Sequence, residues 1–289
     1  MSILWLKSHK IFLLLLFCLP IVATIYSAIR SNGIDVDYYA IPIPHLPEAL
    51  EGFRIVQISD LHLPKNIISI PQLVAVIQEQ HPDIIVFTGD LVDRYANPKT
   101  CGLQQLCQQL TPIAPLYGVL GNHETGLRST SLWRKTFQQC HIQVLQNQST
   151  IITKQGESLA LLGLADNIPY QESLFSHLKA NPHIPKILLA HRPELWSSYC
   201  RDTNLIRPDL VFTGHAHGGQ FRIPFIGGLY APQQGFFPDY TSGLYTAQNG
   251  IKMIVSRGLG QSSLPIRLNN RIHLPVITLK SSVQAAGQP

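Results

Sequence analysis

The segment FRIVQISDLH, residues 53–62, decides the fold, because an apolar run of strand length ends there in an aspartate and a histidine. Apolar runs of similar length recur along the chain, each flanked by Gly, Pro, Asp or His. Their shortness and their β-branched residues favour strands over helices. The predicted strands are Phe53–Ile58, Ile84–Thr88, Leu116–Leu120, Leu159–Leu164, Ile187–Ala190, Leu210–Thr213 and Met253–Val255.

Helical periodicity appears between and after the early strands, over Ser69–Gln80, Gly102–Leu110 and Leu132–Cys140. This alternation is typical of an α/β fold with a largely buried sheet. A leading strand is predicted within residues 31–52, and beyond about Leu210 the sequence is strand-like and rich in Gly, Pro and aromatic residues. We therefore expect sheets packed together in one domain, with helices outside.

Five of the predicted strands end in side chains that can bind metal ions. In chain order these are Asp60 and His62, Asp90, Asn122 and His123, His191, and His215 and His217. Open α/β sheets place their ligand sites at the carboxyl ends of strands. Residues two apart at a strand end can point the same way, so the paired motifs can each converge on one centre. Each motif alone is also typical of a capped turn, and the combination favours the metal site.

The donor set indicates which ions and which reaction to expect. Besides His123 it holds two carboxylates, four imidazoles and one amide oxygen, a mixture that suits Mn²⁺, Fe or Zn²⁺. Two divalent ions would bring more positive charge than two aspartates neutralise, and the surplus suits a hydroxide and a phosphate. The sequence therefore predicts an enzyme with two divalent metal ions, Mn²⁺ first and Fe or Zn²⁺ as alternatives, that hydrolyses phosphate esters or anhydrides.

These motifs resemble the calcineurin-like metallophosphoesterases, over roughly Phe53 to Leu279. The matching segments are Ser59-Asp60-Leu61-His62, Gly89-Asp90, Gly121-Asn122-His123-Glu124, His191 and Gly214-His215-Ala216-His217. The resemblance implies an αββα sandwich of two mixed sheets with flanking helices.

The resemblance also implies a role for each motif residue. One metal would be held by Asp60, His62 and His217, the other by Asn122, His191 and His215, with Asp90 as the bridge. His123 would face the phosphate as a catalytic residue that assists the leaving group. Glu124 stands where the family often has Asp, so its role is open.

Two later stretches, Gly214–Tyr245 and Ser256–Arg271, resemble a bacterial membrane-anchored subgroup of this family. That subgroup includes phosphodiesterases and a UDP-diacylglucosamine pyrophosphatase of lipid A assembly; its usual Pro-Glu ending is Ile272-His273 here. The resemblance implies a membrane-associated phosphodiester or pyrophosphate as substrate. A soluble phosphomonoester or nucleotide is the alternative, and a non-catalytic binding module is a third hypothesis.

Two further groups of residues have open roles. Arg192, Arg257 and Arg267 could bind a second phosphate, or could pair with carboxylates and backbone. The aromatic residues after His217 are expected mainly as sheet core, with an acyl-chain pocket or a membrane contact as alternatives. They are Phe221, Phe225, Tyr230, Phe236, Phe237 and Tyr240.

The run Ile11–Ile29 has no charged residue and, as a helix, would span about 28 Å, close to a bilayer core. We predict an uncleaved anchor over residues 1–30, a metallophosphoesterase domain over 31–280 and a frayed tail over 281–289. The expected location is the bacterial inner (cytoplasmic) membrane. Two positive charges, Lys7 and Lys10, precede the run and one, Arg30, follows it, which favours a cytoplasmic N-terminus and an exported domain. A UDP-linked substrate is cytosolic, so the side of the membrane stays open.

Composition sets broader limits. Of 289 residues 45% are hydrophobic and 13% charged, and the net charge of +5 favours anionic substrates or lipid headgroups. Lys and Arg form no run, so nucleic acid is not expected as a partner. No feature indicates an obligate protein partner. The five cysteines form no CxxC pair and are expected as scattered free thiols.

Overall fold

The computed structural model describes residues 18, 33–126, 130–201, 206–261 and 266–282. Apart from Cys18, the predicted anchor over residues 1–30 lies outside these residues, as does most of the predicted tail. Among the helices that are described, none combines the length and the apolar character needed to cross a bilayer.

The first sheet has six strands in the order β1-β16-β2-β3-β4-β5. Strand β16 is antiparallel to β2, and the other neighbours are parallel, so the sheet is mixed. The bounds are β1 (Ile34–Ile43), β2 (Arg54–Ile58), β3 (Ile84–Thr88), β4 (Leu116–Val119), β5 (Ile142–Val144) and β16 (Ile272–Ser281).

The second sheet also has six strands, in the order β14-β15-β9-β8-β7-β6. Its four inner strands are parallel and its two edge strands antiparallel to their neighbours. The bounds are β6 (Gln148–Lys154), β7 (Glu157–Gly163), β8 (Lys186–Leu189), β9 (Leu210–Thr213), β14 (Gly243–Thr246) and β15 (Lys252–Val255). Between the sheets lies a buried core to which Ile55, Val86, Leu161, Leu189 and Phe212 contribute.

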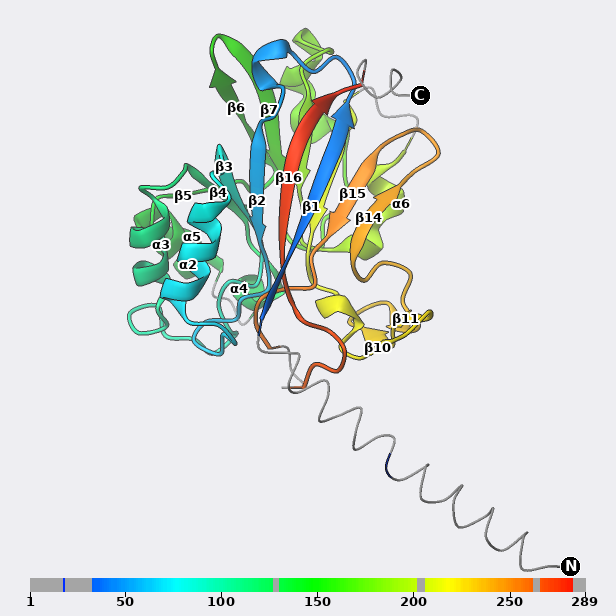
Figure 1. The fold of residues 1–289 in the computed structure, drawn as a ribbon. Coiled ribbons are helices and arrows are strands. Elements are labelled where there is room, and N and C mark those ends of the chain that lie inside the picture. Colours follow the sequence, from blue (N-terminus) through cyan, green and yellow to red (C-terminus); the bar gives the residue numbers. More distant parts are fainter. Residues whose placement is uncertain (1–17, 19–32, 127–129, 202–205, 262–265, 283–289) are drawn as a thin grey trace, which may run out of the picture.

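Helices cover both outer faces (Figure 1). On the first sheet lie α2 (Ile70–Glu79), α3 (Leu103–Leu110) and α5 (Thr130–Gln139), which share a buried cluster with that sheet. On the second lie the shorter η3 (Glu172–Ala180), η4 (Pro193–Leu195) and α6 (Trp196–Tyr199). The predicted two-sheet sandwich with flanking helices is confirmed. The short helices over the second sheet were missed, because η3 is kinked at Phe175 and the other two are single turns, which leave little periodicity in the sequence.

Short elements follow the last histidine motif, His215 and His217, at one end of the sandwich. They are η5 (His217–Gly219), the hairpin of β10 (Arg222–Ile223) with β11 (Gly227–Gly228), and the hairpin of β12 (Tyr230–Ala231) with β13 (Gly235–Phe236). Helix α4 (Asn122–Thr125) lies at the same end, and η1 (Glu48–Leu50) joins β1 to β2.

The expectation that the aromatic stretch is sheet core is wrong for four of its residues. Phe225 is fully exposed, and the exposed fractions of Phe236, Phe237 and Tyr230 are 72%, 62% and 42%. They lie on two-residue strands or on the turns beside them, and within the described part of the chain no second layer covers these hairpins. Tyr240 is half-buried against the core of the second sheet.

Candidate metal centre

The predicted ligands come together where strands of both sheets end. Three donor atoms, from Asp60, His62 and His217, lie within 4.8 Å of one another. A second group, whose donor atoms also lie within 4.8 Å of one another, consists of Asp90, His191 and His215. Asn122 joins the second group, since its Oδ1 is 3.1 Å from His191 Nε2. The two groups correspond to the two ligand sets that the resemblance implies.

The backbone at these positions is unusual. Five of the ligands have left-handed φ angles: Asp60 49°, His62 52°, Asp90 53°, His215 65° and His217 48°. This conformation costs a non-glycine residue about 1–2 kcal/mol, and it concentrates at functional sites. Backbone bonds hold the turns in place, including those from Asp60 N to Gly89 O (3.0 Å) and from His62 N to Asp90 O (3.1 Å).

In the first group, lone pairs face a common space. Asp60 Oδ1 lies 3.6 Å from His217 Nε2, which lies 3.3 Å from His62 Nε2. Burial lowers the pKa of His62 to about 4 and that of His217 well below its usual value, so both rings are neutral. Their Nδ1 atoms are buried without a hydrogen-bond partner. Asp60 is oriented by Ser59 Oγ, which donates to Oδ2 at 2.6 Å, and by the backbone amide of His215.

In the second group, outer hydrogen bonds fix which ring nitrogen faces inward. His191 donates from Nδ1 to Thr88 O at 2.7 Å, which turns Nε2 toward Asn122 and Asp90. His215 donates from Nε2 to the side-chain oxygen of Gln233 and turns Nδ1 toward His191 Nε2 at 3.1 Å. Such partners set the tautomer and orientation of metal-binding histidines.

Asp90 lies between the two groups. Its Oδ1 accepts from His123 N at 2.8 Å, and its Oδ2 is 3.5 Å from His191 Nε2. Burial opposes ionisation of Asp90, but the charge and hydrogen bond of His191 outweigh it and hold the pKa well below its usual range. The bridge position therefore holds a carboxylate.

The mixed carboxylate, imidazole and amide donors, and the neutral rings of His62 and His217, fit a pair of divalent ions. Asp60, His62 and His217 would hold one ion, Asn122, His191 and His215 the other, and Asp90 both. When bound, such ions polarise a phosphoryl oxygen and supply hydroxide at neutral pH.

His123 stands beside the ligands and is arranged as a proton donor. Its Nδ1 accepts from the backbone amide of Arg94 at 3.0 Å, so in the neutral ring the proton is on Nε2. That Nε2 lies 3.8 Å from Asp90 Oδ2. His123 lines a cavity of about 310 Å³ together with Asn122, His215, Tyr230 and others. A proton carried at Nε2 beside this cavity can be given to the oxygen of a leaving group.

Glu124, whose role the sequence left open, braces the loop that carries Asp90. Its Oε2 accepts from the backbone amides of Gly121 (2.8 Å) and Asp90 (3.0 Å), and its Oε1 from that of Val92 (3.1 Å). Burial, and then the nearby Asp90 charge, raise the pKa of Glu124 to about 7. The carboxyl group thus holds the loop that carries Asp90 against the turn that carries Asn122.

We expect Glu124→Ala to destabilise the fold by about 3 kcal/mol or more, because three buried amides lose their acceptor at about 1–3 kcal/mol each. For a domain of this size the melting temperature should fall by roughly 6–12 °C. Thermal unfolding followed by circular dichroism measures this. Glu157→Ala, an exposed position on β7, is the control and should change stability by less than about 0.5 kcal/mol. Equal melting temperatures for the two variants would contradict the bracing role.

The three candidate arginines lie in different surroundings. Arg192 donates from Nε to Asp166 Oδ1 at 2.7 Å and from Nη2 to Oδ2 at 3.1 Å. Arg257 pairs with Asp35 at 2.9 Å, at the start of β1. Both side chains therefore already pair with carboxylates, which was the predicted alternative to phosphate binding.

Arg267 is closer to the ligands. It donates from Nε and Nη2 to Gly260 O at 3.0 and 2.7 Å, and it supports the loop that passes Asp60. Burial lowers the pKa of Arg267 to about 10, against the opposing charge of Asp60. The described residues that line the cavity beside His123 include one arginine, Arg94, and none of the three candidates. It was missed from the sequence, where its only signal is a position four residues after Asp90.

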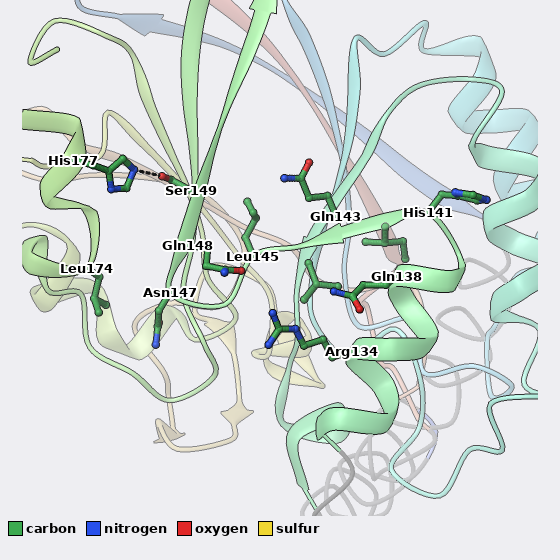
Figure 2. Close-up of a pocket in the computed structure, with 12 residues that line it drawn as sticks. Arg134, Gln138, His141, Gln143, Leu145, Asn147, Gln148, Ser149, Leu174 and His177 are labelled. Atoms are coloured by element: carbon green, nitrogen blue, oxygen red, sulfur yellow. Dashed lines mark hydrogen bonds between the residues drawn. The ribbon is translucent and has the colours of Figure 1, made fainter. Parts of the chain in front are cut away.

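A larger cavity, of about 760 Å³, lies between α5, β5 and β6 (Figure 2). Its polar lining includes Arg134, Gln143 and Asn147, and Ser149 Oγ lies 2.6 Å from His177 Nε2. The described residues that line it include no carboxylate. The metal donors therefore lie at the smaller cavity.

Comparison with known proteins agrees with this geometry. Residues 53–219 match the family model of the calcineurin-like phosphoesterases. The uncharacterized metallophosphoesterase YkuE of Bacillus subtilis is 32% identical over 88% of each chain. The phosphodiesterase YaeI of Escherichia coli is 31% identical over 78% of this chain and 82% of its own. A transmembrane protein with metallophosphoesterase domain from Danio rerio is 28% identical over 91% of this chain and 61% of its own.

Among solved structures, the 5'-nucleotidase precursor of Thermus thermophilus has a TM-score of 0.51 and 14% identity, over 81% of this chain and 55% of that chain. This likeness concerns the fold alone. The match of more than half of the chain, the two relatives above 30% identity and the paired His/Asp clusters lead to one conclusion. This chain belongs to the calcineurin-like phosphoesterase family of metal-dependent phosphoesterases.

Proposed function

We propose that this protein is a two-metal phosphohydrolase that cleaves a membrane-associated phosphodiester or pyrophosphate, with a UDP-linked diacylated sugar such as UDP-diacylglucosamine as one candidate. The observation that carries the proposal is the buried Asp/His/Asn donor set, which opens into a cavity beside the proton-bearing Nε2 of His123. Mn²⁺ is the first metal to test, followed by Fe and Zn²⁺.

The residues around the cavity suit an anionic phosphate. Arg94 and Asn122 line it and offer a guanidinium and an amide to phosphate oxygens. His123 Nε2 can donate to the leaving-group oxygen, and Gln233 lines the same cavity while it orients His215. In this arrangement the chain binds and orients the ester, and it delivers the proton that the leaving group requires.

Apolar residues at the cavity favour a substrate with an apolar part. Tyr230 lines the cavity, and its ring meets that of Phe236 edge-to-face with centroids 5.4 Å apart. The predicted anchor over residues 1–30 and the name of the Danio rerio relative, a transmembrane protein, point the same way. The proposed location is the inner membrane, with the side of the catalytic domain left open.

The test compares kcat/KM for a diacylated UDP-sugar with kcat/KM for its deacylated counterpart, in detergent micelles with each metal in turn. Each methylene moved from water into apolar surroundings contributes about 0.8 kcal/mol, so four or five buried carbons give a preference of several hundred-fold. Equal rates would favour a soluble phosphomonoester or nucleotide. Failure of the metal-loaded protein to turn over any phosphate ester would favour a binding module.

A further inference from the structure

A cluster of exposed apolar side chains lies beside the metal centre. We call it the apolar face, and it consists of Ile223, Phe225, Ile226, Tyr230, Phe236 and Phe237, with exposed fractions from 37% for Ile223 to full exposure for Phe225. No charged residue occurs from 223 to 238. Soluble surfaces rarely gather this many large apolar side chains in one place.

The backbone holds the apolar face close to the ligands. Leu229 N donates to Gly219 O at 3.1 Å and to Phe221 O at 2.8 Å, which ties the first hairpin to η5 and so to His217. Phe237 N donates to Leu229 O at 2.9 Å and ties the second hairpin to the first. The exposed side chains are therefore carried by a hydrogen-bonded scaffold that continues from a metal ligand.

The start of β1 lies at this same end of the molecule (Figure 1). Asp35, near the start of β1, pairs with Arg257 at 2.9 Å. The next residue, Gly258, packs so closely on Asp60 that an added Cβ would lie 2.7 Å from the Cβ of Asp60. The strand that follows the N-terminal segment thus begins beside the metal centre.

The uncharged run Ile11–Ile29 ends five residues before Ile34. Five extended residues span at most about 18 Å. A bilayer that holds this run therefore has its surface within about 18 Å of the start of β1, at the end that carries the apolar face.

From this geometry we infer that the apolar face docks on the lipid bilayer, and that the hairpin tip around Phe225 enters the interfacial layer of the leaflet next to the catalytic domain. Interfacial elements bury their apolar side chains about 5–10 Å deep. Because Tyr230 belongs both to the apolar face and to the cavity lining, docking brings the cavity mouth to the level of lipid headgroups. The inference deepens the proposed function and rests on it for the membrane location of the substrate.

A bilayer fits this face better than a protein does. Protein interfaces surround their apolar core with a polar, hydrogen-bonding rim, whereas the stretch from 223 to 238 carries no charge, and its two glutamines, Gln233 and Gln234, bond within the protein. The absence of charge also means that docking should need neither anionic lipid nor low salt.

The experiment uses the full chain reconstituted in phosphatidylcholine vesicles. Phe225→Trp places a fluorophore at the tip, and its emission is compared with that of the parent protein. We expect the added emission to shift to the blue and to be quenched by a nitroxide at a shallow position on the lipid acyl chain. Ile151→Trp is the matched control, because Ile151 is 49% exposed on β6, and Figure 1 shows β6 at the opposite end.

An unquenched, water-like emission from Phe225→Trp would overturn the inference, as would shielding that occurs in native membranes but not in lipid vesicles, which would indicate a protein partner. Quenching that disappears at high salt would also overturn it, because charge would then be the cause.

A second arm measures turnover. Phe225→Asp with Phe237→Asp should lower the rate on a diacylated substrate in vesicles about tenfold or more, while Ile151→Asp should not. Hydrolysis of a water-soluble nitrophenyl phosphodiester reports whether each variant is folded and active. Quenching without any lipid-substrate turnover would refute the proposed function alone. Lipid-substrate turnover without quenching, and unchanged by the double substitution, would refute the docking inference alone.

Discussion

Asp90→Ala is expected to remove nearly all phosphohydrolase activity while the two sheets still fold. Asp90 is the carboxylate between the two donor groups, with Oδ2 3.5 Å from His191 Nε2 and Oδ1 bonded to the amide of His123. Its removal takes away the carboxylate that the two ions would share. Loss of an outer partner of a ligand already costs about 10–100-fold, so the loss here should be larger. Metal analysis of the folded protein and kcat on a soluble phosphodiester measure both effects.

Asp83→Ala is the matched control for this substitution. Asp83 lies directly before β3, whereas Asp90 follows the far end of that strand. The Asp83 carboxylate accepts from Arg54 N at 2.7 Å and pairs with Lys154 at 2.7 Å. Its loss should lower stability without changing metal content or the rate per folded molecule. A purified, folded Asp90→Ala enzyme that kept two metals and full turnover would refute the bridge assignment.

His123→Ala is expected to keep both metals and to lose the proton donor, a change typically worth about 10²–10⁴-fold in rate. The structural reason is the bond from Arg94 N to His123 Nδ1, which leaves the proton on Nε2 of a ring that lines the cavity. The deficit should be large for alkyl esters, whose leaving oxygen needs a proton. It should shrink for nitrophenyl esters, whose leaving group departs as an anion.

His215→Ala separates this role from metal binding. His215 belongs to the second donor group and should lose metal when truncated. If the metal content of His123→Ala falls as far as that of His215→Ala, His123 is a ligand and its assignment as a proton donor is wrong. A rate deficit that is equal for alkyl and nitrophenyl esters would also contradict the assignment.

The strands and the donor set could be predicted from the sequence because both are local signals. Buried strands such as Ile84–Thr88 are continuous apolar runs, and the residues that follow them must lie at one edge of the sheet. The paired motifs therefore predicted that Asp60, His62, His215 and His217 lie at this edge, where the two donor groups are found.

Roles that depend on distant partners could not be predicted in this way. Whether Arg192 meets a phosphate or a carboxylate depends on Asp166, which lies on a separate loop. The bracing role of Glu124 depends on backbone amides more than thirty residues away. Exposure of Phe225 and Phe236 depends on the absence of a covering layer, which hydrophobicity alone does not reveal.

The position of β16 has a consequence for biosynthesis. Strand β16 lies between β1 and β2, and Ile34 is paired with Ile272 along a ladder of ten residues. At about 5–20 residues per second, β1 leaves the ribosome tens of seconds before β16, its neighbour in the first sheet. During this time β1 presents unpaired amides and carbonyls, which is the state in which strands associate wrongly. Ribosome-bound chains that end before Ile272 should therefore be the ones that need chaperones.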